Sequence, residues 1–267
     1  MLRNVFTKTL RDLRRGFAWW CAGLVGLVAL MVAVYPTVRD NPSLNKLVQD
    51  YPEALKAFIA FGGTLDYVSG AGYLGSELFS FMIPLLFLVA AIGNGAGCVA
   101  GEEERGTLEL LLSHPISRTR VATEKLGAMA TEVAGLALVL WLALWIGAGL
   151  TSMDVSAGRL AAAVLSAALL AVAFGSIAFM LGAATGRRAL AVGLATATAV
   201  AAFLVNSLAE LVHGLRPLQK VSPFYHYAIG DPLREGLAAD HLLVLVTIAA
   251  VAGAAGLVAF ARRDVGR

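Results

Sequence analysis

The chain has 267 residues, of which 58% are apolar and only 15% are charged. Soluble domains carry about 25% charged residues, so this composition excludes an ordinary soluble globular domain. The length leaves room for one helical membrane bundle with short loops. The formal net charge of +3 is small, and the placement of the basic residues is more informative than their total.

The first residues predict an amphipathic helix over 1–16. Leu2, Phe6 and Leu13 recur at helical spacing on one side, and basic residues such as Arg11 and Arg14 cover the other. A basic amphipathic helix of this kind lies in the plane of the membrane interface. A solvated basic tail would not sort its apolar residues to one side, so we expect an interfacial helix that leads into a span.

Six later stretches are apolar and long enough to cross about 30 Å of hydrocarbon, which takes about 20 helical residues. They are 17–35, 74–100, 126–150, 160–185, 189–212 and 242–261. If the N-terminus is cytoplasmic, fourteen of the 21 Lys and Arg residues fall on the cytoplasmic side and seven on the other. Because cytoplasmic loops are enriched in basic residues, the sequence predicts an all-α protein of the inner membrane with both termini in the cytoplasm.

Two longer segments, 36–72 and 213–240, are predicted on the outer side. In the first, Leu44–Val48 and Ala54–Phe61 suggest short helices on the outer surface. The second holds an aromatic cluster, which favours short, partly embedded helices. The cluster consists of Phe224, Tyr225 and Tyr227. Whether either segment gates or binds a substrate is left open.

The cytoplasmic segment 101–125, which we call the elbow, carries the most informative pattern. The second span ends at Glu102–Glu104, the acidic triplet, and a short helix is expected over Thr107–Ser113. Pro115 ends this helix because proline removes an amide donor and biases the preceding residue away from helix. Ser117 is placed to cap the helix that continues into the third span. The leucines on the short helix favour a docking surface over a solvated loop. These leucines are Leu108, Leu111 and Leu112.

The residues Glu-Glu-Arg-Gly-Thr-Leu-Glu-Leu-Leu-Leu from Glu103, followed by Pro-Ile-Ser-Arg from Pro115 and by Lys125, resemble the coupling segment of type-2 ATP-binding-cassette (ABC) permeases. That family characteristically shows an acidic residue, Gly-Thr-Leu, a leucine run, Pro-[Ile/Val]-Ser-Arg and a following lysine. Ser-Pro-Phe at 222–224 and Asp-Pro-Leu at 231–233 resemble the family's segment before the last span. The resemblance covers nearly the whole chain and is specific at the elbow.

The resemblance implies the permease subunit of an exporter, with drug or antibiotic efflux as the commonest association. Two permease subunits, identical or related, pair in the lipid membrane, and two copies of a cytoplasmic ATPase subunit bind beneath them. ATP and Mg²⁺ then belong to the ATPase, and neither a cofactor in this chain nor a nucleic-acid partner is expected. The elbow helix would seat in a groove of the ATPase. Its contact residues would be Glu103, Arg105, Gly106, Thr107, Leu108, Leu111 and Pro115.

The sequence lacks the motifs of a catalytic chain. No Gly-x4-Gly-Lys-Ser/Thr string is present to place backbone amides and a lysine on phosphates. No His-Glu-x-x-His pair is present, and no span holds an interior His or Lys to act as the base of a serine enzyme. We therefore expect no enzymatic activity and no metal site in this chain, with ATP hydrolysis in a separate polypeptide.

Polar residues inside the spans are candidates for function. Glu132 either lines a substrate path or finds a partner such as the Thr131 hydroxyl, and Asn94, beside glycines, is suited to a helix–helix hydrogen bond. Asn206 lies toward the outer end of its span. So few polar groups among apolar walls favour an amphipathic or lipophilic cargo. Two alternatives remain: an ion-driven secondary transporter that uses Glu132, and a non-transporting scaffold or sensor subunit.

Overall fold

A computed structural model describes residues 4–41, 69–113, 115–209, 212–229 and 231–263, and all regular structure within these ranges is helical. Six helices are long and apolar enough to cross a membrane. They are α1 (Val5–Arg39), the continuous run of α4 (Gly70–Leu74), η1 (Gly75–Met82) and α5 (Ile83–Gly97), then α8 (Arg118–Thr151), α9 (Ala157–Thr185), α10 (Arg188–Leu208) and α13 (Ala239–Arg262). The predicted all-α class with six spanning helices is confirmed.

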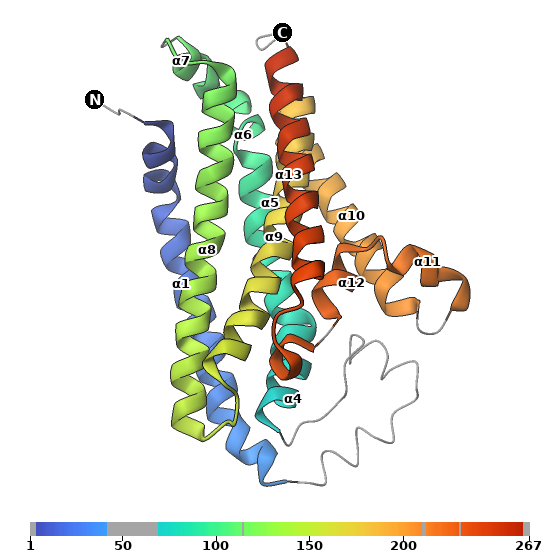
Figure 1. The fold of residues 1–267 in the computed structure, drawn as a ribbon. Coiled ribbons are helices and arrows are strands. Elements are labelled where there is room, and N and C mark those ends of the chain that lie inside the picture. Colours follow the sequence, from blue (N-terminus) through green and yellow to red (C-terminus); the bar gives the residue numbers. More distant parts are fainter. Residues whose placement is uncertain (1–3, 42–68, 114, 210–211, 230, 264–267) are drawn as a thin grey trace.

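The spanning helices form a bundle around α9, which packs against α5, α8, α10 and α13, while α1 packs on the outside against α8. Figure 1 shows the start of α1 and the end of α13 at one end of the bundle, together with the two short helices of the elbow. These are α6 (Ala100–Glu104) and α7 (Thr107–Leu112). Residues predicted to share the cytoplasmic side therefore lie at one end of the molecule.

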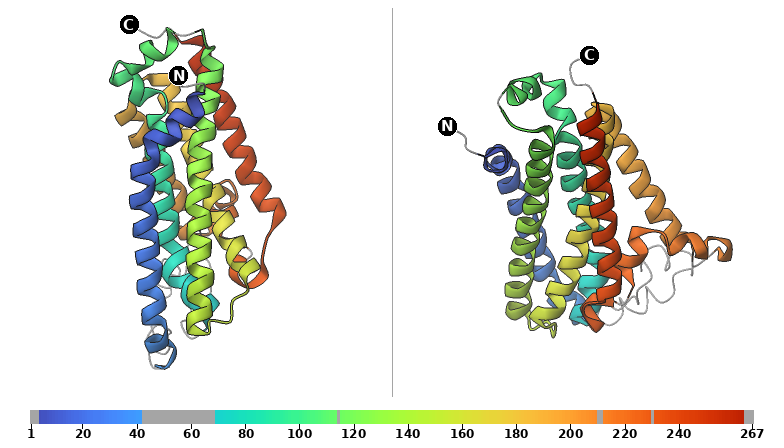
Figure 2. Two further views of the ribbon diagram at one scale, coloured as in Figure 1. Left: turned by 90° about the vertical axis from the view of Figure 1, so that its left-hand side faces the viewer. Right: turned by 45° about the horizontal axis from the view of Figure 1, so that its top comes forward.

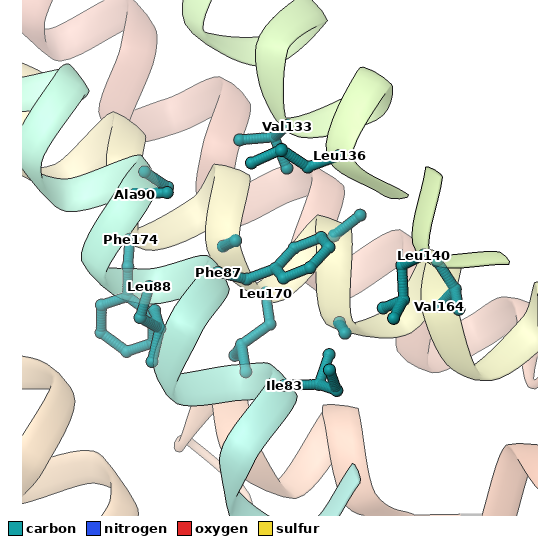
Figure 3. Packing of buried hydrophobic residues seen from close by; sticks show 14 of the residues in the cluster. Ile83, Phe87, Leu88, Ala90, Val133, Leu136, Leu140, Val164, Leu170 and Phe174 are labelled. Carbon is teal, nitrogen blue, oxygen red and sulfur yellow. The ribbon is translucent and has the colours of Figure 1, made fainter. Parts of the chain in front are cut away.

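Small residues let α5 and α9 approach closely at the centre of the bundle. A Cβ atom at Gly95 would overlap the backbone carbonyl of Gly175, so only glycine fits there. Towards the other end, larger side chains of α5 fill the space between α8 and α9. Figure 3 shows Phe87 between Leu136 of α8 and Leu170 of α9, and all three are almost fully buried.

The N-terminal residues continue directly into the first span. α1 is unbroken from Val5 to Arg39, so the helix expected at 1–16 and the span expected at 17–35 form one helix. Figure 2 shows its N-terminal part bending toward α8. The Phe6 backbone N–H donates to Glu124 Oε2 on α8 at 3.1 Å. This contact fixes the start of α1 against the bundle.

The segment before the last span forms short helices that pack on the bundle: η2 (His213–Leu215), α11 (Arg216–Gln219), α12 (Pro223–Ala228) and η3 (Asp231–Glu235). Figure 1 shows α11 and α12 beside the middle of the bundle. The Tyr227 hydroxyl donates to the carbonyl of Phe79 at 2.5 Å, and the Ser222 hydroxyl donates to that of Ala202 at 2.9 Å. The helices expected at 44–48 and 54–61 lie outside the described residues.

Candidate functional site

The elbow turns at a glycine that the backbone requires. Gly106 has φ +68°, in the left-handed region that favours glycine, and it separates α6 from α7. The Thr107 hydroxyl reaches back to the carbonyl of Glu102 at 3.2 Å and closes the turn. As predicted, α7 ends before Pro115, and Ser117 caps α8 by accepting from the Arg120 N–H.

The leucines of α7 face in different directions. Leu108 is fully buried in the core of the chain, Leu111 is half-buried, and Leu110 is 70% exposed. The Leu108 side chain anchors α7 to its own bundle and is not accessible in this structure, so its predicted contact with an ATPase stays a prediction. Leu108 and the half-buried Leu111, three residues apart, lie on the face of α7 that turns toward the bundle. The exposed face holds Thr107, Glu109 and Leu110.

Glu102, the first member of the acidic triplet, is paired inside the protein. Its Oε1 lies 2.6 Å from Lys125 Nζ on α8 and 3.5 Å from Lys8 Nζ on α1. The side chains of Glu102 and Lys125 are only 9% and 3% exposed. A pair this buried depends on both partners, because removing one leaves an uncompensated charge. Sequence reasoning missed this pair, although Lys125 belonged to the family motif.

The other two members of the triplet reach two further helices. Glu103 forms an ion pair with Arg263, just after α13, and the backbone carbonyl of Arg263 accepts from Arg118 Nη1 of α8 at 2.5 Å. Glu104 Oε1 accepts from the backbone N–H of Arg188, the first residue of α10, at 2.8 Å. Three consecutive carboxylates thus tie α6 to α1, α8, α10 and α13.

The remaining elbow residues from the sequence prediction lie at the surface. Arg105 and Pro115 are exposed, and Arg105 lies beside Arg188 above Gly101. The predicted residues Glu103, Arg105, Gly106 and Thr107 all lie at or next to the turn between α6 and α7. Within the part of the chain that the structure describes, no group of three or more His, Cys, Asp or Glu residues is placed to hold a metal ion.

The geometry describes a membrane bundle with a short surface helix that is joined to the ends of four spans. The sequence matches the model of the ABC-2 family transporter proteins over residues 3–265. The chain belongs to this family. A search of curated proteins found no match. Membership makes the chain an integral membrane protein and the membrane component of an ABC transporter.

In this ABC-2 protein, the polar residues expected inside the spans form local contacts. Asn94 Nδ2 of α5 donates to Glu132 Oε2 of α8 at 2.5 Å, and Glu132 is 4% exposed. The Thr131 hydroxyl bonds instead to the carbonyl of Gly127. Asn206 is buried on α10 and accepts from Gln219 Nε2 of α11 through its backbone oxygen at 3.4 Å. Asn94 and Glu132 therefore join two helices, and Asn206 belongs to a separate contact.

Proposed function

We propose that this ABC-2 protein is the membrane subunit of an exporter driven by a separate cytoplasmic ATPase, present in two copies that bind ATP and Mg²⁺. The observation that carries the proposal is that the elbow combines an exposed helix face on α7 with side chains of α6 that are bonded to the spans. α7 presents Thr107, Glu109 and Leu110 outward, whereas the acidic triplet beside it is joined to four spans. Because α7 follows α6 after only two residues, a movement of α7 would be passed to α6 and to the contacts of its acidic triplet.

The arrangement suits transmission of movement from a docked partner. Leu108 holds α7 against the bundle, and Gly106 lets α7 turn away from α6. When the ATPase closes, displacement of α7 would move α6, and its carboxylates would shift the ends of α1, α8, α10 and α13 together. The elbow and both termini would then lie in the cytoplasm, on the inner side of the inner membrane, as the basic residues at this end suggest.

The surface of α5 and α10 supports an amphipathic or lipophilic cargo. An apolar groove of about 530 Å³ lies between these helices. Apolar walls bind ligands mainly through the area they remove from water or lipid, with a few polar groups that fix orientation. In this proposal a second permease subunit, identical or related, pairs with the chain to complete the exporter.

Docking is tested at Leu110. Leu110→Asp places a charge on the exposed face of α7, so we expect co-purification with the partner ATPase and stimulation of ATP hydrolysis to fall about ten-fold or more. Thermal unfolding of the isolated chain should be unchanged, because the side chain is already 70% exposed. Leu218→Asp, at an exposed leucine of α11, is the matched control and should leave the complex intact.

Two outcomes decide this test. If Leu110→Asp leaves the ATPase complex and its hydrolysis rate as in the wild type, α7 is not the docking surface. If Leu218→Asp weakens the complex equally, the effect of the added charge is unspecific, and the assignment to the elbow fails.

A further inference from the structure

The apolar groove ends at a charged residue. Its lining runs along α5 and α10, with Phe81, Phe203 and Phe224 around one end and Arg188 at the other. Arg188 and Phe203 are fifteen residues apart on α10, which is about 22 Å along a helix. The groove is thus long enough to hold an extended acyl chain, and its cationic end lies next to the elbow.

A second, polar cavity begins where the groove ends. It measures about 150 Å³ and lies among α1, α5, α6 and α8. Gly93 and Arg188 line both the cavity and the groove. The two spaces therefore adjoin, one apolar and the other polar, as the two ends of an amphiphile require.

Arg188 lies against a surface without side chains. Gly93, Gly97 and Gly101 follow one another at four-residue intervals. A Cβ atom at Gly97 would lie 3.6 Å from Arg188 Nε, and one at Gly101 would lie 3.4 Å from Arg188 Cδ and 3.9 Å from Arg105 Nη2. The two arginine side chains therefore meet above Gly101.

Within the described part of the chain, the other charged groups around the polar cavity are paired, whereas the two guanidinium groups are not. Lys125 is paired with Glu102, and Asp12 with Lys8 at 3.3 Å. Glu104 accepts from the backbone N–H of Arg188. Among the described residues, no ion pair or hydrogen bond engages either the Arg105 or the Arg188 guanidinium. Two neighbouring guanidinium groups without an acidic partner are suited to a phosphate, which arginine binds in a bidentate manner.

We propose that this site binds an anionic amphiphile, with its phosphate on Arg105 and Arg188 and its acyl chain in the groove between α5 and α10. The charge of the arginines selects an anionic head group, and the adjoining apolar walls select a long tail. As a statement about the exported cargo, this inference rests on the proposed function. As a statement about binding, it concerns the isolated chain alone.

The test uses the purified full chain in a neutral detergent and three probes. These are palmitoyl lysophosphatidylglycerol, palmitoyl lysophosphatidylcholine and inorganic phosphate, titrated by calorimetry. We expect the anionic lysolipid to bind about ten-fold more tightly than the zwitterionic one, since charge-assisted hydrogen bonds are the stronger class. Inorganic phosphate should bind more weakly than either lysolipid, because it gains nothing from the groove.

Three variants locate the site. Arg188→Gln should remove most of the preference for the anionic lysolipid, and Arg188→Lys should restore part of it. Arg187→Gln changes the neighbouring exposed arginine, which does not line either space, and should leave binding as in the wild type. Thr196→Trp adds bulk at an exposed position of the groove lining and should weaken both lysolipids alike.

Several results would overturn the proposal. Equal affinity for the two lysolipids would remove the role of the arginines, and equal losses with Arg187→Gln and Arg188→Gln would indicate an unspecific basic surface. Binding of phosphate as tight as that of the lysolipid would remove the role of the groove. Complete cross-linking of two copies through cysteines at Leu85, without lysolipid binding, would assign the groove to a contact between subunits.

Failure here is distinguishable from failure of the proposed function. Lysolipid binding is measured without the ATPase, whereas docking at Leu110 is measured without lysolipid. A chain that docks its ATPase but shows no preference for the anionic lysolipid would keep the proposed function and lose this site.

Discussion

Lys125 shows how much one side chain can contribute at the inner end of the bundle. Its ammonium is 2.6 Å from Glu102 and almost fully buried. Replacing Lys125 by Met would leave the carboxylate of Glu102 with only the longer contact to Lys8. We expect Lys125→Met to lower the free energy of unfolding by about 3–5 kcal/mol, the usual effect of breaking a buried pair.

The measurement is thermal or denaturant unfolding of the purified chain. Glu102→Gln combined with Lys125→Met removes both charges and should recover part of the loss. Arg120→Gln breaks the exposed pair with Glu124 on the same helix and should lower stability by at most about 1 kcal/mol. Equal losses with Lys125→Met and Arg120→Gln would show that burial of the first pair has no energetic consequence.

A histidine pair joins α12 to α13. His226 Nδ1 of α12 lies 2.9 Å from His241 Nδ1 of α13, and His226 Nε2 lies 2.9 Å from the carbonyl of Lys220. The carbonyl requires a proton on Nε2, so neutral His226 accepts from His241 through Nδ1. Protonation of His226 would make its Nδ1 a donor, and the contact would then require His241 to carry its own proton on Nε2 instead of Nδ1.

The partly buried position of His226 predicts that the protein is less stable in acid. Burial lowers the pKa of His226 from its ordinary value of 6.5, the Lys220 carbonyl opposes this shift, and neighbouring His241 adds to it. The unfolded chain therefore binds a proton first. The stabilising contribution is complete above about pH 6.5 and is lost as the pH falls through the lowered pKa. Asp240, whose carboxylate lies 3.6 Å from His241 Nε2, raises the pKa of His226 and so limits the effect.

Unfolding temperatures measured from about pH 8 to pH 5 check this prediction. The wild type should lose stability across the acidic half of that range, and His226→Gln, which has no imidazole to protonate, should show a shallower dependence. His241→Gln serves as the partner variant, since it removes the Nδ1–Nδ1 contact from the other side. An unchanged slope in both variants would place the acid sensitivity elsewhere.

At the scale of elements, the sequence predicted what hydropathy and local chemistry encode. The six spans follow from apolar length, the end of α7 from Pro115, and the cap of α8 from Ser117. The partners of the acidic triplet could not be predicted in this way. Glu103 meets Arg263 across 160 positions of sequence, and only the packing of α13 and α6 against α9 decides that contact. The inward turn of Leu108 was missed for the same reason.

At the scale of the whole molecule, the Glu103–Arg263 pair distinguishes two roles of the elbow. The family resemblance assigns Glu103 to the surface of a partner ATPase, whereas the structure pairs it with the end of α13, where both side chains are partly shielded at 25% and 20% exposure. If the internal pair transmits movement, Glu103→Arg and Arg263→Glu should each lower transport in the assembled complex by about ten-fold, while the ATPase stays bound. The double exchange should restore most of the transport, because the opposite charges meet again at the same place.

The measurement is ATP-dependent transport in vesicles that contain the full complex, with the amount of bound ATPase determined in parallel. Arg187→Glu, which reverses an exposed charge between α9 and α10 at the same end of the bundle, controls for a general change of surface charge. If Glu103 instead contacts the ATPase directly, Glu103→Arg should release the ATPase, and Arg263→Glu cannot restore it because the new carboxylate faces the wrong partner. Rescue or its absence therefore decides whether this carboxylate belongs to the joint within the bundle or to the surface between subunits.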